Sequence, residues 1–194
     1  MKTTSRPNGV LLKRLLGVLA LCWSVSCGLN KEEYVEWVRN EKNGLHQKKT
    51  AGDYEYEVQY MPQEYLKLLR LGHQASREQW AQDTARSNAQ VFSLKITCVN
   101  DSLAQRLKEA SYEAKQKRDY YFAYLLGNEI RLKEGKALRA PIFSHFETGQ
   151  KEYQLAFEWD GKSRGEATLI IASPPLGKNP AEITVNRASP KLKL

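Results

Sequence analysis

The chain has 194 residues, and its 30 basic and 22 acidic side chains leave a formal net charge of +8. Four of the basic residues lie within the first 26 positions. The remaining 168 residues (194 − 26) therefore carry 26 basic residues against 22 acidic ones, a net charge of about +4. This balance argues against a nucleic-acid-binding protein, and the length suffices for one domain with a hydrophobic core.

The N-terminus has the pattern of a secretory signal peptide. Lys13 and Arg14 precede an apolar run over residues 15–25, and the small residue Ser26 precedes Cys27. A positive start, a short apolar core and a small residue at the cleavage site are typical of such signals. The core of about 11 residues is too short to span a bilayer, which needs about 20. We therefore expect residues 1–26 to be removed.

The residues before Cys27 resemble a bacterial lipobox, so we predict that Cys27 carries the lipid (palmitate-type acyl chains) and that residues 27–30 form a short tether. Ser24 departs from this pattern, because an aliphatic residue is commoner there. Cys22 is a rival site, but Leu21 before it suits cleavage poorly. The alternative is an ordinary secretory signal with an incidental cysteine. If Cys22 is discarded and Cys27 is lipidated, Cys98 remains without a disulfide partner, and we predict that it is buried in a strand.

Helices and strands alternate in the first half. Asn30 and Glu33 form a capping-box pattern before a helix that ends near Gly44. Lys31, Glu32 and Glu33 also resemble a surface-export signal of Bacteroidota lipoproteins. Residues 53–60 alternate between Tyr or Val and polar residues, as in a strand with one buried face. We further expect one helix from Pro62, a second helix capped by Ser76 that extends around residues 80–86, a strand over 89–99 and a helix over 101–116.

The second half has the pattern of a series of strands and short turns. We expect strands over residues 120–126, 129–133, 140–148, 152–159, 167–172 and 182–186, followed by a basic tail over 189–194. The fold class predicted is α+β, mainly an antiparallel sheet folded as a sandwich, with short helices in the N-terminal half. Residues 31–188 are expected to form one domain.

The residues that could support chemistry are few. His145 and Glu147 are two apart in a predicted strand, so they would share a face and could act as a polar pair. Two ligands are too few for a zinc site, and His46 and His73 are expected in loops without ligand spacing. No catalytic residue, metal or cofactor is predicted. Tyrosines crowd residues 120–124; they either fill the core or form an exposed aromatic cluster.

A resemblance bears on these expectations. Residues 119–128, residues 141–147 and the run Leu155-Ala156-Phe157 are similar to a group of Bacteroidota lipoproteins of unknown function. The resemblance implies a bacterial outer-membrane address, on its periplasmic or cell-surface side, and it implies no activity. We expect a non-enzymatic, membrane-anchored protein that binds or helps to assemble an envelope protein or a glycan. The alternatives are an enzyme or glycan-processing accessory protein that uses the face of His145 and Glu147, and a purely structural envelope protein.

Overall fold

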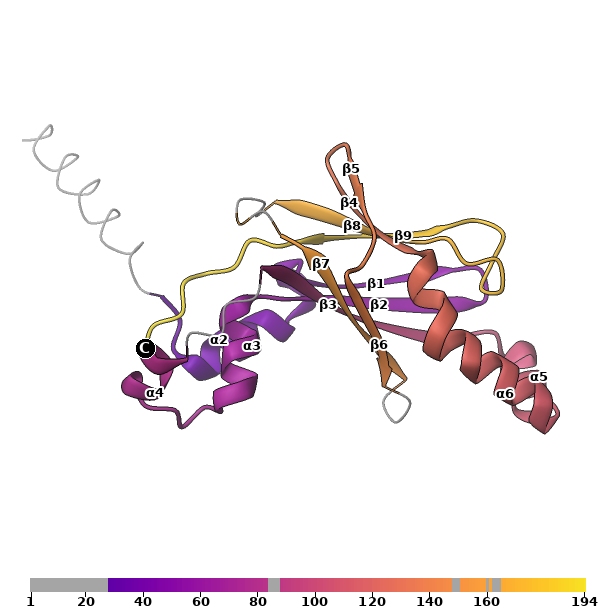
Figure 1. The fold of residues 1–194 in the computed structure, drawn as a ribbon, viewed down its shortest axis with the longest axis horizontal. Coiled ribbons are helices and arrows are strands. Elements are labelled where there is room, and N and C mark those ends of the chain that lie inside the picture. Colours follow the sequence, from indigo (N-terminus) through magenta and orange to yellow (C-terminus); the bar gives the residue numbers. More distant parts are fainter. Residues whose placement is uncertain (1–27, 84–87, 148–150, 160, 162–164) are drawn as a thin grey trace, which may run out of the picture.

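The computed structural model describes residues 28–83, 88–147, 151–159, 161 and 165–194. Its nine strands form two antiparallel sheets (Figure 1), which confirms the predicted α+β class. The five-stranded sheet has the order β1 (His46–Ala51), β2 (Tyr54–Met61), β3 (Ala89–Cys98), β7 (Glu152–Glu158) and β6 (Phe143–Glu147). The four-stranded sheet has the order β5 (Ala137–Arg139), β4 (Ile130–Glu134), β8 (Glu166–Ile171) and β9 (Ala181–Asn186). The signal peptide and Cys27 lie outside the described residues, as do the turn at 149–150 and residues 84–86 of a predicted helix.

One hydrophobic core lies between the two sheets, and it draws side chains from both. The alternation predicted for β2 is confirmed, since Tyr56, Val58 and Tyr60 are buried while the intervening residues are only partly covered. Strand β9 contributes Ala181, Ile183 and Val185 from the other sheet. Alternation of this kind places every second side chain in the core, so each sheet buries one face and leaves the other to solvent.

The helical elements of the first half are α2 (Lys31–Arg39), a 3-10 turn η2 (Glu41–Asn43), α3 (Gln63–Leu71) and α4 (Arg77–Gln82). Helices α2 and α4 begin where the capping boxes predicted, and α3 begins directly after Pro62, which forms no side-chain cap. Both capping boxes are formed: the Asn30 side chain accepts from the Glu33 amide, and the Ser76 side chain accepts from the Gln79 amide. These bonds satisfy amides that have no partner inside the helix, which is why both helices start there.

Two predicted elements are wrong. The single helix over 101–116 is two helices, α5 (Asp101–Glu109) and α6 (Tyr112–Tyr120), and Ser111 caps the second. The strand predicted over 120–126 is helical, because α6 continues into a π-helical turn η3 (Tyr121–Leu125) and a 3-10 turn η4 (Leu126–Glu129). A short run of apolar residues suits a strand or a helix equally, and the preceding helix decides the outcome here.

The two ends of the described chain lie side by side. Leu29 and Leu192 form a parallel β-bridge, in which the Leu29 amide donates to the Lys191 carbonyl at 3.0 Å and the Lys193 amide donates to the Leu29 carbonyl at 2.7 Å. The segments predicted as a tether and as a basic tail are thus paired with each other. Figure 1 shows this end beside α2–α4, while α5 and α6 lie at the opposite end of the molecule.

Candidate functional site

His145 and Glu147 project from the outer face of β6, an edge strand of the five-stranded sheet, and both are exposed. Their strand register places them beside Gln154 and Glu152 of β7. The His145 ring stacks on Phe143 with a centroid distance of 6.3 Å and an interplanar angle of 25°. An open strand edge lacks the enclosure and the convergent polar groups that mark most small-molecule sites.

A shallow cavity of about 150 Å³ opens on the same outer face, nearer the middle of the sheet. Its lining consists of His46, Glu57, Gln59, Ser93, Lys95 and Glu152. His145 and Glu147 do not line it. The cavity is smaller than the roughly 300 Å³ of a typical ligand pocket, so at most one small group fits into it.

His46 was predicted to lie in a loop, and this prediction is wrong. It begins β1 rather than lying in a loop, because residues 46–51 pair with β2 to form a hairpin. Its Nε2 atom lies 2.7 Å from Glu57 Oε1, and its Nδ1 atom lies 3.4 Å from the Arg39 carbonyl oxygen. The sequence of β1 has no apolar alternation, so only the turn residues Gly52 and Asp53 could have indicated a hairpin.

The register of the described strands keeps His46 and Ser93 of this face apart. Gln59 lies between His46 and Ser93 in the register of β1, β2 and β3. His46 and Ser93 are therefore two strands apart, roughly 10 Å, which is too far for a proton transfer between them. Among the described residues, no group of three His, Cys, Asp or Glu side chains could hold a metal ion. Cys98 is partly exposed at the end of β3, so it is less buried than predicted.

The tyrosines of residues 112–124 are divided between the interior and the surface, because they lie on consecutive helical turns. The Tyr121 hydroxyl group turns inward and makes hydrogen bonds with Glu129 Oε2 and with the buried Ser173 Oγ. Burial, followed by the hydrogen bond with Glu129, raises the pKa of Tyr121 above its ordinary value. This tyrosine therefore holds the π-helical turn against the four-stranded sheet.

Three other tyrosines form an exposed row, which we call the tyrosine stripe: Tyr112, Tyr120 and Tyr124. They are 77%, 58% and 69% exposed, respectively. The Tyr120 and Tyr124 rings have a centroid distance of 5.0 Å, and Gln116 Nε2 donates to the Tyr112 hydroxyl group at 2.7 Å. Positions 112, 116, 120 and 124 recur every four residues, so adjacent members are neighbours on the helix surface and the row winds gradually around the helix over about 18 Å.

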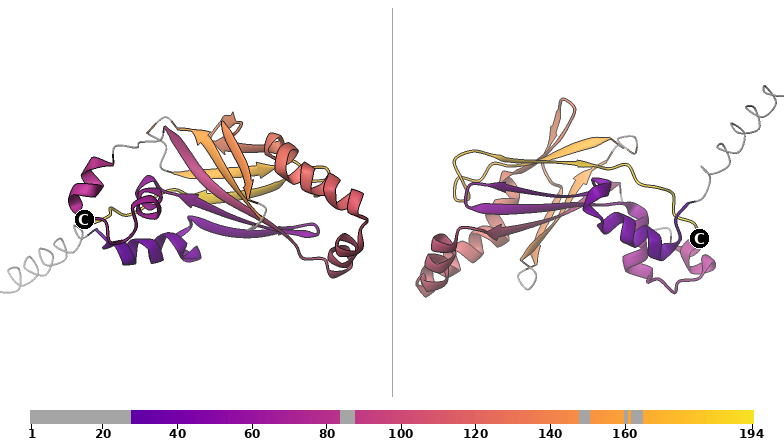
Figure 2. Two further views of the ribbon diagram at one scale, coloured as in Figure 1. Left: turned by 60° about the horizontal axis from the view of Figure 1, so that its bottom comes forward. Right: turned by 180° about the vertical axis from the view of Figure 1, so that it is seen from behind.

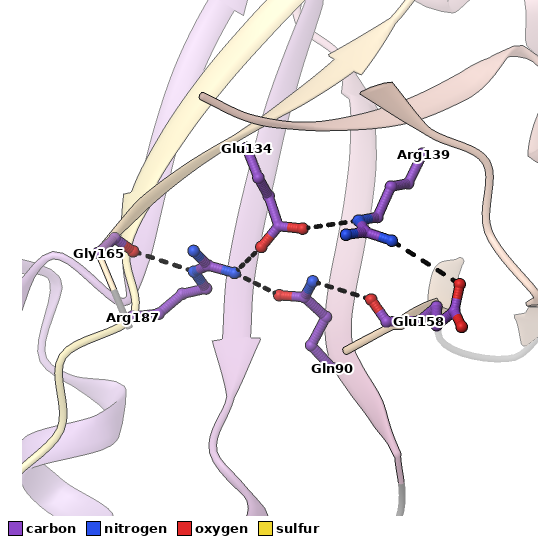
Figure 3. A network of polar contacts seen from close by, with 6 residues as sticks. All are labelled: Gln90, Glu134, Arg139, Glu158, Gly165 and Arg187. Atoms are coloured by element: carbon purple, nitrogen blue, oxygen red, sulfur yellow. Dashed lines mark hydrogen bonds and ion pairs between the residues drawn. The ribbon is translucent and has the colours of Figure 1, made fainter. Parts of the chain in front are cut away.

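A buried polar network joins the two sheets at one end (Figure 3). The Arg187 side chain, only 3% exposed, donates to the Gly165 carbonyl at 3.0 Å, to Gln90 Oε1 at 2.6 Å and to Glu134. Arg139 Nε binds the second oxygen of Glu134 at 3.0 Å. Each of these contacts joins two groups within the chain, so the network holds the two sheets together.

Comparison with protein-family models, with curated proteins and with solved structures found no match for this chain. Within the described residues, no helix has the length and apolar character that a membrane crossing requires.

Proposed function

We propose that this protein is a lipoprotein of the bacterial outer membrane, anchored through Cys27, that binds or helps to assemble an envelope protein without catalysing a reaction. The anchor is supported by the signal pattern before Cys27 and by the folded domain, whose first β-bridge, at Leu29, comes two residues after it. Lasting attachment needs two or more acyl chains, each adding about 0.8 kcal/mol per buried CH₂ group. The resemblance to Bacteroidota lipoproteins supports the outer-membrane address.

The tyrosine stripe is the observation that carries the binding role. Large aromatic side chains bury much area at a small entropic cost, and tyrosine is enriched in protein interfaces. Three of them stand exposed on one helix, where they contribute nothing to the core. Tyr112 and Tyr120 lie on α6, which Figure 1 shows at the end of the molecule opposite the C-terminus, so a partner can reach them without approaching the anchored end.

An enzymatic role that uses His145 and Glu147 is less well supported. Both residues lie on an open edge strand, outside the small cavity of that face. The other histidine of this face has both ring nitrogens near protein oxygens, at 2.7 and 3.4 Å.

Acyl labelling tests the anchor. Cells that produce the full-length chain are fed an alkyne analogue of palmitate, and the membranes are fractionated. We expect label and membrane association with the native chain, with Cys22→Ser and with Cys98→Ser, and loss of both with Cys27→Ser. A labelled, membrane-bound Cys27→Ser variant would refute lipidation at this position.

Site-specific photo-crosslinking tests the binding role. A benzophenone amino acid replaces Tyr124, and a control replaces Thr184, an exposed residue on the outer face of the four-stranded sheet. We expect one defined protein adduct from position 124 that is absent from position 184. The same adducts at both positions, or none at 124, would contradict a binding role for the stripe, and an adduct with glycan alone would replace the protein partner with a carbohydrate.

A further inference from the structure

The C-terminal segment is bonded to the first described residues of the chain. Leu29 lies between Lys191 and Lys193, with backbone hydrogen bonds of 3.0 and 2.7 Å. Leu192 is partly buried and packs against the core, while its two lysine neighbours point outward and are exposed. The alternation is that of a short strand with one buried face, so the segment is part of the folded domain.

Gly28 also takes part in this contact. A Cβ atom on Gly28 would lie 2.6 Å from the Lys191 carbonyl oxygen, which is closer than van der Waals contact allows. The backbones of the two segments therefore approach each other more closely than any other residue at position 28 would permit. The contact begins at the residue that directly follows Cys27 in the chain.

The short connection determines which part of the domain meets the membrane. Cys27 is bonded directly to Gly28, and Gly28 is held against the Lys191 backbone. Consecutive Cα atoms are about 3.8 Å apart, so the lipid on Cys27 is attached within one residue of this contact. We propose that residues 191–194 rest on the phospholipid headgroups of the bilayer that holds Cys27. They then act as a clamp that keeps the α2–α4 end of the domain toward the membrane. This inference rests on the lipid anchor proposed above.

The chemistry of this end suits headgroups. Lys191 and Lys193 are exposed, and long lysine side chains can lie along a surface while their ammonium groups reach phosphate. Arg77 at the start of α4 donates to the Leu194 carbonyl oxygen at 2.7 Å, which holds the last residue in place. Glu32 is exposed nearby, so the end is of mixed charge. The contact therefore follows from the short connection, which keeps the lipid at a high effective concentration, more than from net charge.

The same geometry places the tyrosine stripe away from the membrane. Figures 1 and 2 show α5 and α6 at the far end of the molecule from the C-terminus in every view. A clamped domain presents that end outward in a fixed way, whereas a domain on a free tether would tumble and present all faces.

Depth-dependent quenching tests the clamp. Full-length lipidated protein with Cys98→Ser is labelled with a small fluorophore at Lys193→Cys or at Tyr112→Cys. It is placed in vesicles of phosphatidylethanolamine and phosphatidylglycerol that contain nitroxide-headgroup lipid. We expect the nitroxide to quench the label at 193 at least three-fold more than the label at 112. Equal quenching at the two positions would overturn the inference.

Two variants release the clamp while keeping Cys27. Leu192→Asp puts a charge into the core contact, and Gly28→Ala forces a Cβ against Lys191. Gly165→Ala is the matched control, because a Cβ there meets nothing within 4 Å. We expect both release variants to lose the preferential quenching at 193 while they still float with the vesicles, and the control to keep it. Release variants that keep it would refute the clamp, and a native protein that does not float would refute the anchor itself.

Discussion

Replacing Arg187 by methionine measures how strongly the polar network holds the two sheets together. The guanidinium group is 3% exposed and bonds to residues of both sheets, including Gln90 of β3 and Glu134 of β4. Methionine fills much of the same volume but leaves the Glu134 carboxylate, 10% exposed, without its most buried partner. Removing one member of a buried ion pair typically costs about 3–5 kcal/mol.

The structure places this variant at the lower end of that range. Glu134 keeps the bond from Arg139 at 3.0 Å, so its charge is not left wholly unpaired. We expect a loss of about 3 kcal/mol in the free energy of unfolding, which lowers the Tm by roughly 6–12 °C in a domain of this size. Arg187→Lys keeps the charge but loses the forked geometry, and we expect it to cost about 1 kcal/mol.

Urea denaturation of the Cys27→Ser protein, followed by circular dichroism, provides the measurement, with the slope m compared between variants. Arg139→Met is the control, because that side chain is 32% exposed and its loss should cost about 1 kcal/mol or less. A loss below about 1 kcal/mol for Arg187→Met, with m unchanged, would show that the network contributes no net stability. The reasoning from burial and bonding would then be wrong.

Three further predictions use the same denaturation assay. Tyr121→Phe should lower the free energy of unfolding by about 1–2 kcal/mol, because it leaves the buried Ser173 hydroxyl group without a partner. Tyr124→Ser should change it by less than about 0.5 kcal/mol, because Tyr124 is exposed. Equal losses for the two variants would contradict the inward placement of Tyr121 and the outward placement of Tyr124. Asn30→Ala removes the cap of α2 and should cost about 1 kcal/mol, and an unchanged midpoint would argue against the capping box. The pKa values of Tyr121 and Tyr153 are raised in the fold, mainly by burial, so their contribution is complete below the unfolded value of about 10 and is lost as pH rises above it. Stability that stays flat from pH 9 to 11 would contradict this direction.

Local patterns predicted much of the fold. The alternation in β2 and the capping boxes at Asn30 and Ser76 involve residues within a few positions of one another, and the structure confirms each of them. Strand β1 was missed because its residues, His46–Ala51, have no buried alternation and are held by pairing with β2. The run over residues 120–126 was predicted as a strand because an apolar heptapeptide fits either a strand or a helix, and only the helix before it selects between them.

For the candidate sites, too, the sequence predicted local placement but not the contacts between distant segments. The two-residue spacing of His145 and Glu147 placed them on one face, but it could not show that the strand lies at a sheet edge, outside the cavity. The pairing of His46 with Glu57 depends on a hairpin whose register the sequence did not indicate.

The sequence by itself determined the α+β class, the starts of α2 and α4 and the expectation of a lipid anchor at Cys27, because each depends on the order of neighbouring residues. Only the tertiary structure decided which tyrosines face solvent, that Arg187 joins two sheets, and that Leu192 pairs with Leu29. These features depend on segments far apart in the chain, and the periodicity of a segment shows which of its faces is buried but not which distant segment covers that face.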